Sequence, residues 1–299
     1  MDFRLLFDYD VELAETPIWD VRIKKWYWTD LFLGKVHRYD PVTQEDEVFD
    51  TCPKGKDACM IGSAIPCEDE NFLLCVNECG VQLLDLITGS LSLVTHPETD
   101  VSNRYNDSRV DKAGRLLFSS VSKHYGTDKY HPDMKGTFYL LDTDHKTVVK
   151  LIEGIEQYNA IVWNSDSSKM YVIDTYNQQL ISFDYSVDSG PLSGPNVALD
   201  LKPYGMPDGM SIDTQDNLYI CHWSGKITVW DKTLSFVKEI KFPVQYVCCG
   251  GFGGEDMRDF YVATSKYCYT PEQLKENPGA GGIFSARSDI PGCPDNFFR

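Results

Sequence analysis

The sequence lacks the segments that carry a chain into or across a membrane. No apolar run approaches the roughly 20 residues that a bilayer-spanning helix needs. The first residues, Met-Asp-Phe-Arg-Leu-Leu-Phe-Asp, lack the charged-then-apolar pattern of a signal peptide. The ten cysteines form no CxxC pair with zinc-finger spacing. We therefore expect a cytoplasmic protein whose cysteines are small buried apolar residues rather than disulfides or a metal cluster.

Basic residues are also scarce: 28 Lys and Arg face 45 Asp and Glu, a net charge of −17. An acidic surface repels nucleic acids and anionic membranes, so we expect neither as a partner. The same charge favours cations near the protein, although acidity often serves solubility alone. The chain has 299 residues, 42% of them hydrophobic, and this size is compatible with a monomer with a packed core.

What the sequence does contain is an internal repeat. Six segments share a strand–turn–strand pattern rich in β-branched and aromatic residues. They begin near Tyr27, Phe72, Leu116, Met170, Leu218 and Phe260. Helical periodicity is nearly absent, and TPEQLKENPG after Tyr269 is the one short helix we expect, as an insertion in the last repeat.

A second shared element lies upstream of each hairpin. The six copies read ETPIWD, IGSAIP, NDSRVD, NAIVWN, DGMSID and CCGGFG, and their fifth position is always apolar. A repeat of about 40 to 50 residues with about four strands is typical of a propeller blade. We therefore predict an all-β fold, a single six-bladed β-propeller domain with a central channel that spans residues 1–299.

The first residue of each copy has a special position in such a fold. Equivalent positions lie at one level around the propeller axis, so their side chains should converge at one end of the channel. These residues are Glu15, Ile61, Asn106, Asn159, Asp208 and Cys248. Four of the six carry oxygen donors.

This oxygen-rich ring predicts a site for one divalent cation. Carboxylates and amides suit Ca²⁺, Mg²⁺ or Mn²⁺ better than a soft metal, although Zn²⁺ or Fe²⁺ could also bind. The alternative is a polar channel end whose residues only bond one another. Two ionised carboxylates held close together repel each other, and this repulsion favours the metal site over the polar channel end. Arg104 precedes Asn106 by two residues, so both face one side of an extended strand, where a guanidinium can bind ligand oxygens.

The chain resembles the SMP-30/gluconolactonase/luciferin-regenerating-enzyme family, also called regucalcin-like, over essentially its whole length. The matching motifs, in order, are AETPIWD with YWTD, RYNDSRVDKAGR, YNAIVWNSD, PDGMSID, GGFGGED and ENPGAGGIF. The resemblance implies a six-bladed propeller, in agreement with the repeat count. It also implies hydrolysis of a sugar-acid lactone, such as glucono-, xylono- or arabinonolactone.

The resemblance further assigns roles to individual residues. It implies that Glu15, Asn159 and Asp208 bind the metal, that Arg104 and Asn106 contact the substrate, and that Asp208 is the base. The chain departs from the family at Ser108, where NDG is frequent, and at Tyr158 and Ala160, where SNG is frequent. His124 stands where related aldonolactonases carry a glutamate that contacts the sugar, so we assign it to the substrate. The loop with His124 and His131 is a candidate lid.

Other mechanisms find less support in the sequence. No GxSxG motif is present, which argues against a serine nucleophile. Cys248 and Cys249 lie near the ring, but no histidine occupies an equivalent position to activate a thiol. Two alternatives stay open: a calcium-binding regulatory protein, and a metal-dependent esterase or organophosphate hydrolase. The GH…WD signature of interaction propellers is absent.

Overall fold

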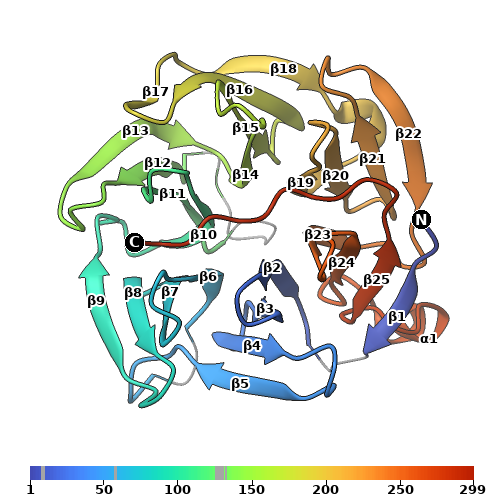
Figure 1. Ribbon diagram of the computed structural model, residues 1–299, viewed down its shortest axis with the longest axis horizontal. Helices are drawn as coiled ribbons and strands as arrows, with labels where there is room; N and C mark the ends of the chain where they lie inside the picture. Colours follow the sequence, from blue (N-terminus) through green and yellow to red (C-terminus); the bar gives the residue numbers. More distant parts are fainter. Residues whose placement is uncertain (8–10, 57–58, 125–130, 132) are drawn as a thin grey trace.

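The computed structural model describes residues 1–299 except 8–10, 57–58, 125–130 and 132. Six small antiparallel sheets are arranged around a central axis, and five of them are each contributed by one stretch of the chain (Figure 1). The six-bladed β-propeller predicted from the repeats is confirmed. Every predicted hairpin start falls at or within two residues of the first residue of a second blade strand, because the β-branched and aromatic runs pack between blades.

Each of the first three blades uses four consecutive strands. The first contains β2 (Ala14–Asp20), β3 (Lys25–Asp30), β4 (Lys35–Tyr39) and β5 (Asp46–Asp50). The second contains β6 (Ile61–Pro66), β7 (Phe72–Asn77), β8 (Gly80–Asp85) and β9 (Leu91–Thr95). The third contains β10 (Asn103–Val110), β11 (Leu116–Ser122), β12 (Gly136–Leu141) and β13 (Val148–Ile155).

The remaining blades vary this plan. The fourth contains β14 (Tyr158–Trp163), β15 (Lys169–Asp174), β16 (Gln179–Ser186), the short β17 (Gly190–Pro191) and β18 (Asn196–Asp200). A 3-10 turn, η1 (Lys202–Tyr204), precedes the fifth blade of β19 (Pro207–Ile212), β20 (Leu218–His222), β21 (Lys226–Trp230) and β22 (Phe236–Lys241). The sixth blade contains β23 (Val247–Gly253), β24 (Asp259–Thr264), β25 (Ile283–Arg287) and β1 (Arg4–Phe7).

The sixth blade takes its outer strand from the other end of the chain. β1 pairs with β25 in antiparallel register, with Arg4 opposite Ser285 and Phe7 opposite Ile283. This pairing ties the N-terminal strand to the last blade and covers the outer edge of β25. The repeat pattern did not predict this strand.

The apolar fifth positions of the repeat lie in the packing between blades. Five of them are buried, namely Trp19, Ile65, Val110, Ile212 and Phe252, while Trp163 is half-buried. The six innermost strands contact one another in a closed circle in the order β2, β6, β10, β14, β19, β23 and back to β2. They all run in the same direction along the axis, so their first residues share one end of the channel.

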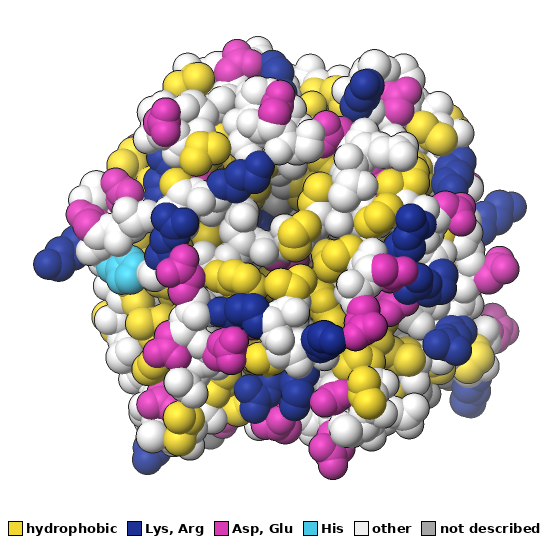
Figure 2. All heavy atoms as spheres, viewed as in Figure 1, with side chains coloured by type: hydrophobic (Ala, Val, Ile, Leu, Met, Phe, Trp, Pro, Cys, Tyr) yellow, Lys and Arg dark blue, Asp and Glu magenta, His cyan; other side chains and the backbone are white. Residues whose placement is uncertain are grey.

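The chain after β25 covers the opposite end of the channel. It crosses the middle of the view in Figure 1 and forms isolated bridges from Gly292 to Asp213 and from Phe298 to Cys67. Pro66 and Asp213 lie at or just beyond the far ends of their inner strands. Figure 2 shows this view as spheres, with acidic and basic side chains interspersed around its rim. The tail covers one end of the channel. The route into the channel is therefore the other end, where the inner strands begin.

The one α-helix among the described residues is α1 (Pro271–Glu276), as predicted, within the connection from β24 to β25. Thr270 caps it: its side chain accepts a hydrogen bond from Gln273 N, and the Gln273 side chain accepts one from Thr270 N. Within the described residues, no helix has both the length and the apolar character needed to cross a lipid bilayer.

Candidate active site

All six innermost strands share an irregularity close to the start of the strand. The register of each strand against its neighbour shifts by one residue, between Glu15 and Ile18, Ile61 and Ser63, Tyr105 and Ser108, Asn159 and Ile161, Pro207 and Met210, and Val247 and Cys249. A one-residue β-bulge interrupts the alternation of side chains and can turn two consecutive residues toward one side. Thr16 adopts a positive φ of 47° in the first bulge, an unusual conformation for a β-branched residue.

These bulges surround a cavity of about 470 Å³ at the same end of the channel. The consecutive pairs Glu15–Thr16 and Asn106–Asp107 both line it, as expected where a bulge breaks the alternation. Its other polar lining residues are Arg104, Ser122, Lys123, Gln157, Asn159, Thr175, Asp208, Tyr176 and Tyr267. Its apolar wall includes Leu13, Leu31, Phe32, Met60, Met206 and Trp223. Five of the six residues predicted for the site thus border one cavity.

The three residues predicted to bind metal come together in this cavity. Asn159 Nδ2 lies 2.7 Å from Asp208 Oδ1 and 2.8 Å from Thr175 Oγ1. Carboxylate oxygens of Glu15 and Asp208, together with Cys248 Sγ, lie within 4.8 Å of one another. Glu15, Asn159 and Asp208 come from β2, β14 and β19, so three blades contribute one donor each.

The electrostatics of this cluster are unfavourable for two free carboxylates. Burial raises the pKa of both Glu15 and Asp208, and the charge of Asp208 further raises the pKa of Glu15. A hydrogen bond from Trp223 and the charge of Arg104 oppose the rise in the pKa of Asp208 but do not cancel it. A divalent cation would relieve this repulsion, and the donors are those that a divalent cation takes, so the residues fit such an ion.

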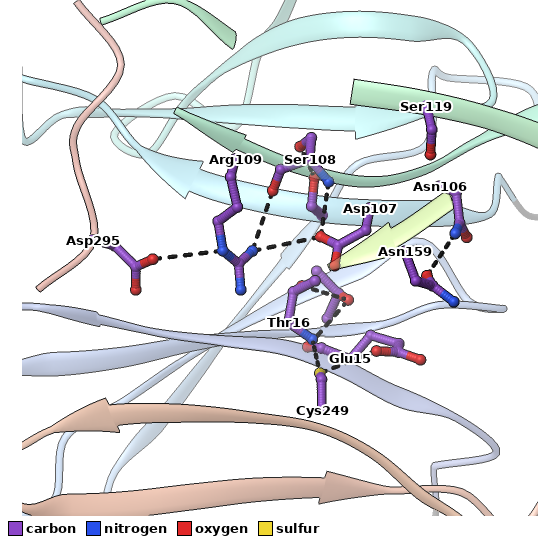
Figure 3. Close-up of polar contacts among 12 residues, drawn as sticks. Glu15, Thr16, Asn106, Asp107, Ser108, Arg109, Ser119, Asn159, Cys249 and Asp295 are labelled. Carbon is purple, nitrogen blue, oxygen red and sulfur yellow. Dashed lines mark hydrogen bonds and ion pairs between the residues drawn. The ribbon is translucent and has the colours of Figure 1, made fainter. Parts of the chain in front are cut away.

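Arg104 and Asn106 lie directly beside this cluster. Arg104 Nη1 donates to Asn106 Oδ1 at 2.8 Å and to the Tyr105 carbonyl at 3.0 Å. Asn106 Nδ2 in turn donates to Asn159 Oδ1 at 2.6 Å (Figure 3). The predicted substrate-binding pair is therefore joined to a predicted metal ligand by a continuous hydrogen-bond chain.

His124 has a different position. It is half-buried just after β11, and its backbone N–H donates to Ser122 Oγ at 3.1 Å. Ser122 and Lys123 line the cavity, and His124 is the next residue along the chain. His131 is exposed, with Nδ1 3.3 Å from Asp133 Oδ2. Most of the candidate lid between the two histidines, residues 125–130, lies outside the described residues.

Several residues at the site had no signal in the repeat pattern. Trp223, which follows β20, donates from Nε1 to Asp208 Oδ2 at 2.7 Å. Cys249 Sγ accepts from Thr16 N at 2.8 Å and lies 3.1 Å from Glu15 Oε2 (Figure 3). Trp223 and Cys249 thus hold the two carboxylates in place. For Cys249, the one sequence signal was its position next to the ring residue Cys248, and for Trp223 there was none.

A line of charged side chains continues from the cavity along the channel, with Asp107 and Arg109 buried and Asp295 half-buried. Arg109 Nη1 lies 3.5 Å from Asp107 Oδ1, and Arg109 Nε lies 3.5 Å from Asp295 Oδ1 (Figure 3). Burial raises the pKa of Asp107 and of Asp295, and the Arg109 charge opposes both rises. The C-terminal tail therefore supplies a carboxylate to the far end of the channel, where it balances a buried cation.

Comparison with known proteins finds relatives over most of the chain. Residues 13–266 match the family model described as SMP-30/Gluconolactonase/LRE-like region. The chain is 29% identical over 296 residues to YvrE of Bacillus subtilis, which covers 98% of this chain and 97% of that protein. It is 27% identical over 295 residues to a 6-deoxy-6-sulfogluconolactonase of Pseudomonas putida, with 96% and 94% covered.

A solved structure supports the same assignment at the level of the fold. The crystal structure of a calcium-binding protein, regucalcin, from Agrobacterium tumefaciens superposes with a TM-score of 0.90 at 21% identity, covering 100% of this chain and 97% of that one. With the family model matched over most of the chain, the resemblance inferred from the sequence motifs is confirmed. The chain belongs to the SMP-30/gluconolactonase/LRE-like family.

Proposed function

We propose that this protein is a metal-dependent hydrolase that opens a small sugar lactone. The observation that carries the proposal is the convergence of Glu15, Asn159 and Asp208 from three blades in one channel-end cavity. The relationship to a protein named 6-deoxy-6-sulfogluconolactonase supports a lactone as the substrate class. The specific sugar acid is part of the proposal, with aldonolactones as the first candidates.

Glu15, Asn159 and Asp208 would hold the cation. When bound, a divalent cation supplies a Lewis acid that polarises the lactone carbonyl and stabilises the developing oxyanion. Asp208 takes the proton from the attacking water at a carboxylate oxygen. The Trp223 N–H fixes the orientation of that carboxylate. The proton then passes to the ring oxygen as the ester C–O bond breaks, which gives the open hydroxy acid.

Arg104 and Asn106 position the substrate. Their hydrogen-bond chain to Asn159 places a guanidinium and an amide beside the reacting centre, where they can bind ring hydroxyl groups. His124 neighbours the cavity-lining Lys123, and contact with a sugar substituent stays part of the proposal.

The test is a pH-stat assay of aldonolactones with chelator-treated protein. We expect turnover of at least one of glucono-, xylono- or arabinonolactone that disappears after EDTA treatment and returns with an added divalent cation. Chelator-resistant turnover would contradict the metal dependence.

One observation favours a second candidate, because the Agrobacterium relative is described as calcium-binding. If the protein binds calcium tightly and turns over no lactone, ester or organophosphate above background, the result would support a calcium-binding regulatory protein instead.

A further inference from the structure

The sixth blade places a sulfur atom beside the two carboxylates. Cys248 lies at the start of β23, at the ring position equivalent to Glu15 and Asp208, and its Sγ is within 4.8 Å of a carboxylate oxygen of each. Three atoms within that distance of one another all lie within about 2.8 Å of a common point, near the roughly 2.3 Å of a zinc–sulfur bond. One small cation could therefore contact all three donors after a modest closure.

Packing holds this sulfur in place. Cys248 is fully buried, against Leu13 and Leu31 on its apolar side. Gly209, next to Asp208, lies so close that a Cβ there would be 2.0 Å from Cys249 Cβ and 2.8 Å from the Cys248 carbonyl oxygen. The absence of a side chain at residue 209 thus lets the strand of Asp208 lie directly against the strand of Cys248.

The neighbouring thiol has a different role. Cys249 Sγ accepts from Thr16 N at 2.8 Å and lies 3.1 Å from Glu15 Oε2, so its hydrogen-bonding capacity is used in orienting Glu15. Cys221, also buried nearby, packs in the apolar cluster of the fifth and sixth blades. Among the described cysteines, Cys248 is the one whose sulfur groups with both carboxylates as a potential ligand.

We propose that Cys248 Sγ is a direct metal ligand together with Glu15, Asn159 and Asp208, and that it makes the site prefer zinc-like cations over calcium. A thiolate is a soft donor that suits Zn²⁺, Co²⁺ or Cd²⁺, whereas Ca²⁺ takes six to eight oxygens. On binding, the Cys248 thiol releases one proton to solvent and the sulfur forms the metal bond. This inference rests on the metal site of the proposed function and names which cation that site selects.

The decisive experiment is a titration of the metal-free full-length chain with Co²⁺ alone. The wild type should develop a sulfur-to-cobalt charge-transfer absorption in the near ultraviolet. Cys248→Ser should abolish it, while Cys249→Ser and the control Cys293→Ser, a half-buried cysteine of the C-terminal tail at the other end of the channel, should retain it. Absence of the absorption in the wild type, or its survival in Cys248→Ser, would overturn the proposal.

Metal competition provides a second readout. The ratio of the Ca²⁺ to the Zn²⁺ dissociation constant should fall on the order of tenfold or more in Cys248→Ser, since a ligand matters at least as much as the groups that support it. An unchanged ratio would also overturn the proposal. Circular dichroism of the metal-free variants checks folding, and Cys248→Ala repeats both measurements if a buried serine hydroxyl perturbs the blade.

These outcomes are separable from the proposed function. The cobalt absorption does not depend on turnover, so a protein that shows it and hydrolyses no lactone would keep the ligand assignment and lose the activity. A protein that hydrolyses a lactone but shows no cobalt absorption would keep the activity and lose the ligand assignment.

Discussion

The indole N–H of Trp223 donates a 2.7 Å hydrogen bond to Oδ2 of Asp208. This contact lowers the pKa of a carboxyl group that burial otherwise raises, and it fixes the direction of the oxygen atoms. Trp223 also forms part of the apolar cavity wall. One side chain thus both shapes the cavity and orients the group to which we assign the proton transfer.

Trp223→Phe should lower kcat/KM for the best lactone about tenfold to a hundredfold, because hydrogen bonds to charged groups contribute about 1.5–3 kcal/mol. Steady-state kinetics with saturating metal measure the effect. Trp163→Phe is the matched control, since the half-buried Trp163 indole N–H has no hydrogen-bond partner among the described residues. Equal losses in the two variants would show that the Trp223 hydrogen bond has no special role.

Asp208→Ala and Glu15→Gln should each reduce hydrolysis on the order of a thousandfold or more, the upper range for single groups that stabilise charge in an active site. Both should weaken metal binding in calorimetric titrations. Neither should unfold the metal-free propeller, because each removes one member of a repelling buried pair. The exposed Asp188→Ala is the control for Asp208. A variant Asp208→Ala that keeps most of the activity would refute the mechanism.

The raised carboxyl pKa values predict how metal-free stability depends on pH. Burial raises the pKa of Asp208 to about 7, well above that of the unfolded chain. Between an unfolded value of about 4 and the folded value, the folded state binds more protons, so this group makes stability fall as pH rises. The loss of stability caused by Asp208 is absent at a pH below both pKa values and is complete at a pH above the folded-state pKa.

We therefore expect the melting temperature of the metal-free wild type, relative to Asp208→Asn, to fall between about pH 4 and about pH 7, the window set by those two pKa values. Differential scanning calorimetry across this range measures the difference, and the variant cancels the contributions of other titrating groups. Added divalent metal should remove the decline by neutralising the pair. A difference that rises with pH would contradict the assigned direction of the shift.

Arg104→Lys should separate substrate positioning from metal binding. Lysine keeps the charge but loses the planar fork of donors that reaches Asn106, so we expect kcat/KM to fall about tenfold or more. The dissociation constant for metal should stay within about twofold, since Arg104 is not one of the proposed ligands. Arg4→Lys, on the exposed face of β1, is the control. Loss of metal affinity equal to the loss of activity would place Arg104 in the metal site.

The sequence predicted the features that repeat. Blade number, hairpin positions and the convergence of Glu15, Asn159 and Asp208 all follow from one alignment of six copies, since rotation maps equivalent residues to one level of the channel. The short helix was predicted because its cap and its proline are local signals. These predictions needed no knowledge of contacts between distant segments.

Features that no shared residue pattern marks were not predicted. No single residue type is common to all the bulges in the inner strands. The local sequence therefore did not predict that Asp107 lines the same cavity as Asn106. The ion pair between Arg109 and Asp295 joins β10 to the C-terminal tail, a contact that depends on the closed ring. Cys248 occupies a ring position in the sequence pattern, but that pattern does not distinguish a thiol nucleophile from a metal ligand.

The pairing of β1 with β25 makes the order of synthesis matter for assembly. Residues 4–7 are synthesised before every inner strand, whereas their partner strand at residues 283–287 is synthesised after every inner strand. During translation β1 therefore has no native partner until β25 has been made, and only then can the sixth blade be completed. Closure of the circle is thus a late, long-range folding event, and until it occurs the first and sixth blades cannot hold Glu15 and Cys248 at a common centre.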